Sequence, residues 1–551
     1  MVGRMLSAMN KQIRGLHEAA YLLAFFAFFS QVLALVRDRA FAHFFGAGEI
    51  LDAYFAAFRI PDLVFALLAL FISSFALIPL IAEKGGAQSE DSRELVGSVL
   101  TVFGFVSVVL SIILFVAAPL LVPLLFPGFT DTTLDTIVAL SRIMLLQPIL
   151  LGISSVAASV IQSSRRFFLF ALAPIFYNVG IITGVLFLYP LLGVVGLAWG
   201  VVLGATFHLL IQIIPAFVHD RSLLPRIPRN VFSHSGRVAL LSLPRALALS
   251  SQQALLLVFV AIASFAAAGS VSVMSFAFNL QSVPLSVIGM SYAAALFPSL
   301  SLLYTKGDLE TYVKEVWIAV RHTVLWIMPA VTLMIVLRAQ IVRVILGSGE
   351  FTWADTRLTA AVLAGFLFSL VAQGVIVIFS RAYYAAGRSL EPIVVNVSAA
   401  IIASLLAWRG VVWIREAPFA RYFIEDIFRI TDIPGTEIVM IALAYSVTMI
   451  VAAITFGFLY ARRFGFEKRT ATSLLFSFAA SVIGAAAAYG GLQILAPLLP
   501  TDTFLGIFAQ GAGAGLLGIA GWMGTLYVLH SRDFDEVTSV LYRLILRKRR
   551  G

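Results

Sequence analysis

The sequence contains no cysteine and few charged residues. The absence of cysteine excludes disulfide bonds, cysteine-ligated metal sites and a thiol nucleophile. Charged residues make up only 12% of the 551 residues, and 61% are hydrophobic. Soluble domains carry roughly 25% charged residues. Together with a mean hydropathy of +1.00, this composition excludes a soluble globular protein and predicts an integral membrane protein.

Motifs for enzyme chemistry are also missing. The seven histidines are scattered and show no HExxH or other metal-ligand spacing. A Gly-x-Gly-x-x-Gly pattern runs from Gly513 to Gly518, but it lies in an apolar run with no strand before it. Small residues that let helices approach closely explain this pattern better than a dinucleotide site. The sequence therefore predicts no catalytic residue, no cofactor and no metal.

The apolar runs have the length of membrane-spanning helices. Most contain about twenty residues or more, which suits a spanning helix rather than a barrel strand. They cover residues 16–44, 50–82, 94–126, 136–163, 168–190, 193–218, 238–266, 271–303, 316–346, 357–386, 390–408, 437–461, 471–497 and 504–530. The first run lacks a small-residue cleavage site, so we interpret it as a retained helix. We predict an all-α polytopic membrane protein with about fourteen transmembrane helices.

Lysine and arginine gather in alternate connections between these runs. One side carries most of them, including Lys84, Arg93, Arg165, Arg166, Arg221, Arg226, Arg229, Arg237, Lys306, Lys314, Arg388, Arg462, Arg463 and Lys468. Short loops on the other side keep Glu49, Asp131, Asp135, Glu350, Asp355 and Asp502. By the positive-inside rule both termini are cytoplasmic. The net charge of +10 therefore indicates topology and contact with anionic lipid headgroups, and not nucleic-acid binding.

The second half of the chain repeats features of the first. Residues 174–179 (PIFYNV) recur as residues 392–397 (PIVVNV), and residues 48–79 resemble residues 269–298 at nearly the same offset. Six helices return the chain to its starting side, so the repeat is parallel, as in transporters that bind substrate between their repeats. The predicted parts are an N-lobe at 1–218, a basic cytoplasmic linker at 219–237, a C-lobe at 238–461, two further helices in 462–530 and a basic cytoplasmic tail at 531–551.

One predicted outer connection, residues 409–436, is longer than the others. It mixes aromatic side chains such as Phe419 and Tyr422 with charged ones such as Arg415 and Glu425. This mixture indicates an amphipathic helix on the outer membrane surface. The alternative, a solvated loop, would expose the aromatic side chains to water.

Residues 36–62 place charged side chains within apolar segments. A charge at the centre of a bilayer costs about 2.5–3.5 kcal/mol on insertion scales, so such residues persist where they face a protein interior or a wet cavity. Asp52 and Arg59 are two helical turns apart and share a face, and Pro61 frees a backbone carbonyl. Two interpretations remain open: ion pairs that hold helices 1 and 2 together, or an electropositive wall that binds an anionic headgroup. The candidate binding residues are Arg37, Arg39, Asp52, Arg59 and Asp62, with Arg142 and Arg245 as further buried cations.

The same stretch carries a family resemblance. Val36-Arg37-Asp38, Phe45-Gly46-Ala47, Asp52-Ala53-Tyr54 and Ala57-Phe58-Arg59-Ile60-Pro61 resemble the N-terminal signature of the MurJ/MviN family. Its members are bacterial lipid II flippases of the multidrug/oligosaccharidyl-lipid/polysaccharide exporter superfamily. Residues 296–301, 349–352 and 381–385 also match, so the resemblance covers essentially the whole chain.

The resemblance implies a fold and a function. The fold would have two six-helix lobes around a central cavity, with the last two helices forming a groove for a polyprenyl tail. A monomeric transporter would move undecaprenyl-diphosphate-linked muropeptide across the bacterial cytoplasmic membrane by alternating access, without bond chemistry. Arg37, Asp52 and Arg59 keep the family pattern. Gln31, Phe65, Leu70-Phe71 and Asn279 replace residues that are usually charged or part of its Glu-Gly motif, and Asn279 joins the candidate site by this alignment.

These departures leave other functions open. A flippase for another polyprenyl-linked glycan would fit the missing arginines. A cation-coupled multidrug antiporter of the same superfamily would need an acidic cavity, whereas the candidate cavity is net basic. A scaffold that transports nothing is a third alternative.

Overall fold

The structure is a computed structural model that describes residues 16–72, 74–164, 166–218, 225, 231–500, 503–536 and 538–539. Helices account for nearly all of these residues, and no strand occurs among them, which confirms the all-α prediction. The chain divides into two compact units, Met1–Ser272 and Val273–Gly551.

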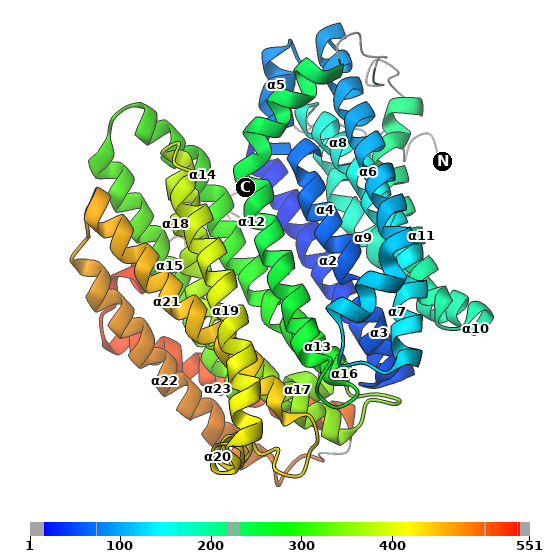
Figure 1. Ribbon diagram of the computed structural model, residues 1–551. Helices are drawn as coiled ribbons and strands as arrows, with labels where there is room; N and C mark the ends of the chain where they lie inside the picture. The colour runs from blue at the N-terminus through cyan, green and yellow to red at the C-terminus, as the bar shows by residue number, and fades with distance from the viewer. Residues whose placement is uncertain are drawn as a thin grey trace, which may run out of the picture. The chain divides into compact units, whose positions relative to one another are not determined.

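The first unit is a bundle of long helices (Figure 1). Its elements are α2 (Leu16–Phe45), α3 (Glu49–Ala57), α4 (Arg59–Ile72), α5 (Ser74–Glu83), α6 (Glu90–Leu125), α7 (Asp131–Met144), α8 (Leu146–Ser163), α9 (Phe167–Thr183), the π-helix η1 (Gly184–Leu188), α10 (Tyr189–Leu192), α11 (Val195–Val218) and α12 (Val231–Ala263). Helix α2 packs against α9, α9 against α11, and α4 against α12. This packing brings the charged residues of α2 and α4 into the interior of one bundle.

The predicted linker at 219–237 is partly helical, because α12 begins at Val231. The rest of the linker, apart from residue 225, lies outside the described residues. The contacts divide the chain after α12, at Ser272. The division into lobes at residues 219–237 therefore stays a prediction that rests on the sequence repeat.

The second unit contains the remaining helices. They are α13 (Ser270–Pro284, whose first turn belongs to the first unit), the π-helix η3 (Leu285–Gly289), α14 (Met290–Thr305), α15 (Leu309–Val336), α16 (Arg338–Leu346), α17 (Trp353–Leu367), α18 (Leu370–Ala385), α19 (Leu390–Glu416), α20 (Pro418–Phe428), the 3₁₀-helix η4 (Thr436–Ile438), α21 (Val439–Phe464), α22 (Arg469–Leu495) and α23 (Phe504–Val528). Helices α22 and α23 pair along their length, and α15 packs against α22.

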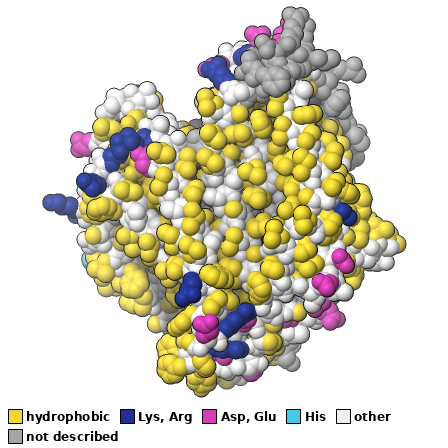
Figure 2. Space-filling view, in the orientation of Figure 1, with side chains coloured by type: hydrophobic (Ala, Val, Ile, Leu, Met, Phe, Trp, Pro, Cys, Tyr) yellow, Lys and Arg dark blue, Asp and Glu magenta, His cyan; other side chains and the backbone are white. Residues whose placement is uncertain are grey.

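Each predicted apolar run corresponds to one helix or to two or three successive helical segments. Among the described residues, twelve helices are long and apolar enough to cross a membrane, or thirteen if the bent pair α17 and α18 forms one span. Helix α2 accounts for the remaining predicted span. Figure 2 shows hydrophobic side chains over the middle of the helices and charged side chains toward their ends, as expected for a membrane protein.

The structure adds two details to the sequence interpretation. The amides of Asn178 and Asn396 each donate to the carbonyl four residues earlier, at 3.0 and 2.8 Å, so the repeated motif has the same local geometry in both halves. The glycine pattern packs α23 on α22, since a Cβ at Gly518 would lie 3.0 Å from the carbonyl oxygen of Gly484.

The 409–436 connection is helical for much of its length. Helix α19 continues to Glu416, which corrects the predicted end of this span at residue 408, because no proline interrupts the chain between residue 408 and Pro418. Helix α20 follows and is amphipathic: Phe419 is 83% exposed, whereas Glu425 is buried. The amphipathic helix is thus confirmed, and its place on the outer membrane surface stays a prediction.

Candidate functional site

A polar cluster lies inside the first unit. Arg37 on α2 donates to Oδ1 of Asp38 from Nε and Nη2, at 3.0 and 2.8 Å, and from Nη1 to Oδ1 of Asn178 on α9, at 3.1 Å. The Asp38 side chain is only 3% exposed, so this ion pair is shielded from solvent. Because Asn178 also donates to the carbonyl of Pro174, its amide is fixed, and Arg37 is held at a defined position between α2 and α9.

The cluster continues onto α3, α4 and α8. Tyr54 on α3 and Tyr177 on α9 lie within electrostatic range of Arg37. Both tyrosines are also within range of Asp62 on α4. Gln147, a buried residue of α8, lies within electrostatic range of Asp62. Five helical elements therefore contribute polar side chains to one region within the membrane spans.

Arg59 is the member of the cluster with an unused donor. It begins α4, with Asp62 one turn away as its electrostatic neighbour, and it forms no ion pair with any carboxylate in the described part of the chain. Its Nε is buried and has no hydrogen-bond partner. Leaving a buried donor unsatisfied costs about 1–3 kcal/mol, and more for a charged group. A buried, unsatisfied charged donor at the start of α4, inside a predicted membrane span, indicates a functional role for Arg59.

Asp52 has a structural role that the sequence did not reveal. Its carboxylate accepts hydrogen bonds from the backbone N–H groups of Gly269 and Ser272, both at 2.7 Å, and from Oγ of Ser272 at 2.5 Å. It thereby caps the N-terminus of α13, where a negative charge is favoured. Both carboxylate oxygens are occupied, and Asp52 forms no ion pair with Arg59, although the two residues share a helical face by periodicity. Gly269 has φ +89°, and a Cβ there would lie 2.3 Å from the carbonyl oxygen of Ala47, so only glycine fits this junction.

Replacing Asp52 should lower stability. In Asp52→Ala the N–H groups of Gly269 and Ser272 lose their acceptor, and we expect a loss of about 1–3 kcal/mol in the free energy of unfolding. Asp52→Asn keeps one acceptor oxygen and should lose less. Glu49→Ala, an exposed acidic residue on the same helix, is the matched control and should stay within about 0.5 kcal/mol. Thermal unfolding of the detergent-purified protein measures the difference, and equal stability of Asp52→Ala and Glu49→Ala would refute the capping role.

Arg142 bonds to a helix backbone and does not join the cluster. Its Nε donates to the carbonyl of Phe115 on α6 at 3.0 Å, and its guanidinium lies 4.8 Å from the centroid of that ring. This carbonyl is free because Pro119, one turn on, has no N–H. The structure thus corrects the expectation that Arg142 faces the same space as Arg37.

Ser141, the residue before Arg142 on α7, likewise donates to a carbonyl that a proline leaves free. Ser141 Oγ donates to the carbonyl of Ala57 at 3.3 Å, and both residues are buried. This is the carbonyl that Pro61 was predicted to free. It is satisfied inside the bundle, because a buried polar group in a membrane protein needs a protein partner.

The other candidate residues are placed as follows. Arg39 is half-buried in α2 and makes contacts of its own. Arg245 lies in α12, but its side chain is outside the described residues. Asn279 is half-buried in α13 and belongs to the second unit. A binding role for these three stays a prediction.

The charges of the cluster balance. Arg37 is offset by Asp38, and Arg59 has Asp62 nearby. The expectation of a net basic wall is therefore not met by these four residues, because each arginine has an acidic neighbour on its own helix.

The sequence analysis missed several residues of this cluster. Asn178 and Tyr177 were used only as part of the repeat motif and Tyr54 only as part of a family pattern, while Gln147 was not considered. The signal that pointed to them was the same for all four: a side chain able to form hydrogen bonds inside an apolar run.

A second buried charge network lies in the second unit and was also missed. Arg321 on α15 is 1% exposed and pairs with Glu467 and, through Nε at 3.2 Å, with Asp533. Asp533 also accepts from Arg469 at 3.1 Å and from Ser473, both on α22. An arginine in the middle of the apolar run of α15 was the available signal.

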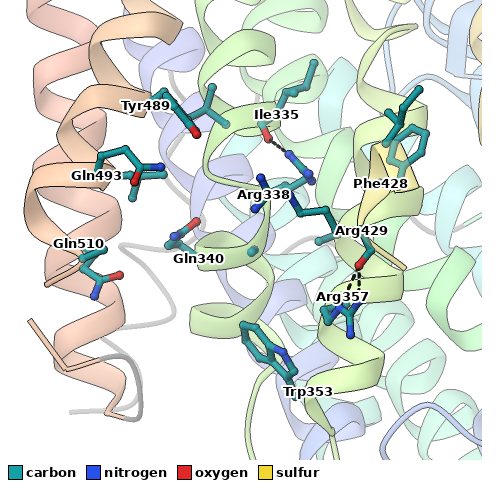
Figure 3. A pocket seen from close by; sticks show the side chains of 16 residues that line it. Ile335, Arg338, Gln340, Trp353, Arg357, Phe428, Arg429, Tyr489, Gln493 and Gln510 are labelled. Carbon is teal, nitrogen blue, oxygen red and sulfur yellow. Dashed lines mark hydrogen bonds between the residues drawn. The ribbon is translucent and has the colours of Figure 1, made fainter. Parts of the chain in front are cut away.

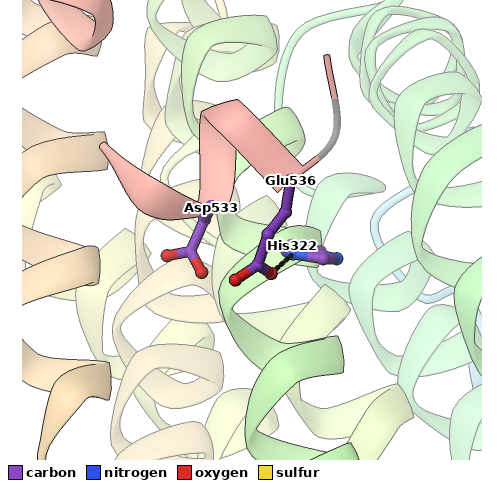
Figure 4. Close-up of side chains that lie close together, drawn as sticks. All are labelled: His322, Asp533 and Glu536. Atoms are coloured by element: carbon purple, nitrogen blue, oxygen red, sulfur yellow. Dashed lines mark ion pairs between the residues drawn. The ribbon is translucent and has the colours of Figure 1, made fainter. Parts of the chain in front are cut away.

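His322, Asp533 and Glu536 bring three potential metal ligands within 4.8 Å of one another. Figure 4 shows the two carboxylates on one helical turn beside the imidazole, and Nε2 of His322 lies 3.7 Å from Glu536. The carboxylate of Asp533 already serves Arg321, Arg469 and Ser473, so the ion-pair network explains this cluster without a metal.

Comparison with known proteins identifies the family. The family model described as "Lipid II flippase MurJ" matches residues 41–508. The chain belongs to the MurJ family. Lipid II flippase MurJ of Burkholderia cenocepacia is 28% identical over 400 residues, which are 71% of this chain and 77% of the relative.

Solved structures agree on the fold. A structure described as lipid II flippase MurJ in an inward closed conformation matches with a TM-score of 0.72 at 22% identity and covers 96% of this chain and 100% of that chain. An inward-facing multidrug resistance transporter of the MATE family matches with a TM-score of 0.64 at 18% identity, over 80% of this chain and 95% of that chain. Identities this low show the fold alone, and the MurJ fold predicted from the sequence is confirmed.

Proposed function

We propose that this protein is a lipid II flippase that moves undecaprenyl-diphosphate-linked muropeptide across the bacterial cytoplasmic membrane by alternating access. Membership of the MurJ family supports the substrate class. The observation that carries the proposal for this chain is Arg59, a cation within the membrane spans whose buried Nε has no partner. An incoming diphosphate would supply the missing acceptor.

The proposed task requires recognition and no bond chemistry. The barrier to flipping is the transfer of a diphosphate and sugars through hydrocarbon, and a polar site that offers hydrogen-bond donors to the diphosphate lowers it. Arg37 is immobilised by Asp38 and Asn178, whereas Arg59 keeps a donor for the ligand. Guanidinium groups suit this role because they can bind phosphate oxygens in a bidentate manner. The tail would stay in lipid beside α22 and α23.

Further parts of the proposal concern membrane placement. The charge asymmetry of the loops supports cytoplasmic termini, an outer position for residues 409–436 and contact of the basic loops with anionic headgroups. We propose a monomeric transporter.

Two other functions fit particular observations. A flippase for a different polyprenyl-linked glycan is favoured by Gln31, Phe65 and Asn279, which replace charges usual in the family. A cation-coupled drug antiporter is favoured by the charge balance of the cluster. A net basic cavity would have argued against cation binding, and the four charged residues of the cluster are balanced.

Depletion of the protein in its native cell, followed by a leaflet-resolved assay of lipid II, tests the proposal. We expect lipid II to accumulate in the inner leaflet and to become inaccessible to an externally added probe. Accumulation of another polyprenyl-linked glycan, with normal lipid II, would favour the second flippase. Normal distribution of both lipids would exclude a flippase function.

A further inference from the structure

A pocket with a volume of about 700 Å³ opens in the second unit, and none of the cluster residues of the first unit lines it. It lies where α15 passes into α16, and α17, the end of α20, α22 and α23 complete its walls (Figure 3). The volume is within the range of small-molecule sites. The proposed transport function does not use this pocket.

Three arginines line the pocket, and one of them is neutralised. Arg357 binds Asp432 with two hydrogen bonds, at 2.9 and 2.7 Å, and this contact holds the pKa of the Asp432 carboxyl below its usual range. Arg338 donates to the carbonyl of Ile335 at 2.9 Å. Neither Arg338 nor Arg429 forms an ion pair with a carboxylate of the described chain, and Arg429 is within electrostatic range of Arg338. Two neighbouring cations without a counter-ion form a site for an anion.

The backbone of Arg429 gives an independent reason to assign it a function. Arg429 ends α20 in the left-handed conformation, with φ 60° and ψ 48°. Glycine or asparagine is favoured at this position of a helix, and an arginine there is strained. Arg357 holds the residue in place by donating to its carbonyl oxygen from Nε, at 3.0 Å, and from Nη2. Strain that is retained and braced in this way indicates a functional position.

The surroundings place the pocket at a membrane–water boundary. Trp353 and Tyr489 line it and are 56% and 53% exposed, as is typical of interfacial aromatic residues. The exposed apolar face of α20, with Phe419 and Phe423, is that of a helix lying in the headgroup region. On the α22 side, Leu492 and Ala496 line the pocket, so this wall is partly apolar.

We propose that this pocket binds an anionic phospholipid, with the phosphate between Arg338 and Arg429 and the acyl chains along α22 and α23. The amides of Gln340 and Gln493, which also line the pocket, offer donors to the glycerol oxygens. Bound in this way, the lipid would join α20 to the helix pair α22 and α23. The diphosphate of a polyprenyl lipid and free phosphate share part of this chemistry, so the test must distinguish the three sources.

Thermal stabilisation of the detergent-purified full chain by added lipid measures the binding. We expect phosphatidylglycerol to raise the unfolding temperature, while phosphatidylcholine, whose choline offsets the phosphate charge, has little effect. In Arg429→Gly the guanidinium is lost but the backbone strain is relieved, so the protein should fold at least as well as the wild type. We expect its affinity for phosphatidylglycerol to fall by about tenfold or more, since a hydrogen bond to a charged group is lost. Arg338→Gln should weaken binding by a similar factor.

Arg421→Gln is the matched control. Arg421 lies on the same helix, pairs with Glu425 at 2.8 Å and does not line the pocket. Its loss should leave phosphatidylglycerol binding unchanged. The proposal is overturned if Arg429→Gly binds phosphatidylglycerol as the wild type does. It is also overturned if undecaprenyl diphosphate binds through these arginines and phosphatidylglycerol does not, or if inorganic phosphate stabilises the protein as well as the lipid does.

Discussion

Arg59→Ala is expected to insert and fold normally but to flip lipid II poorly. In the wild type the buried Nε has no protein partner, so truncation removes no hydrogen bond from the bundle at this atom. A hydrogen bond from a charged donor to the substrate is worth about 1.5–3 kcal/mol, which corresponds to a transport loss of about 10- to 150-fold. Arg59→Lys keeps the charge but not the bidentate geometry and should retain partial activity. Flipping of labelled lipid II in proteoliposomes measures both variants.

Two further variants separate binding from charge balance. If Arg59 served only to offset Asp62, then adding Asp62→Asn to Arg59→Ala would restore transport. We expect no such rescue, because the missing partner is the ligand. Arg237→Ala, whose side chain is 61% exposed, is the control for loss of an arginine from the first unit. A well-folded Arg59→Ala protein with full transport would rule out both roles.

Asp533→Ala is expected to cause a large loss of stability. Asp533 is 2% exposed and joins Arg321 of α15 to Arg469 and Ser473 of α22. Its removal leaves the buried guanidinium of Arg321 with Glu467 alone. Breaking a buried ion pair by removing one partner costs about 3–5 kcal/mol, and the remaining glutamate places the expected value toward the lower end. Heating the purified protein in detergent and following the loss of monodisperse protein measures the change.

A control and a rescue sharpen this prediction. Asp535→Ala removes an exposed carboxylate two residues away and should change the free energy of unfolding by less than about 0.5 kcal/mol. Arg321→Met combined with Asp533→Leu removes both charges and should recover much of the stability. If Asp533→Ala proves as stable as Asp535→Ala, the network does not hold α15 and α22 together.

The sequence was sufficient for the helices and the family, because both depend on local signals. A run of about twenty apolar residues forms a spanning helix wherever it packs, and the patterns around Arg37 and Arg59 are contiguous. The positions of the breaks between helices could be predicted less well from the sequence. The turn between α3 and α4 falls at Phe58, three residues before the proline that suggested it.

The partners of charged side chains could not be predicted, since they depend on which helices become neighbours. Asp52 and Arg59 share a helical face by periodicity, yet Asp52 caps α13, more than two hundred residues further along the chain. The sequence predicted Arg142 to be a buried cation of the candidate site, yet its side chain donates a hydrogen bond to a backbone carbonyl of α6. Asp533, near the C-terminus, gave no sign that it would meet Arg321. Such contacts follow from tertiary packing and leave no periodic trace in the chain.

A proline in a membrane helix is commonly regarded as a flexible hinge. In the first unit, consecutive residues of α7 form hydrogen bonds with the backbone at two such prolines. Ser141 donates to the carbonyl that Pro61 leaves without an N–H partner, and Arg142 donates to the one that Pro119 leaves without a partner. Helix α7 therefore supplies hydrogen-bond donors to the backbone at both proline positions. A change of backbone geometry at either proline would leave a carbonyl without its hydrogen-bond donor inside the membrane. Each unsatisfied backbone group in hydrocarbon costs on the order of several kcal/mol. We expect the backbone at both prolines to keep its geometry through a transport cycle, and α4, α6 and α7 to move as one rigid unit.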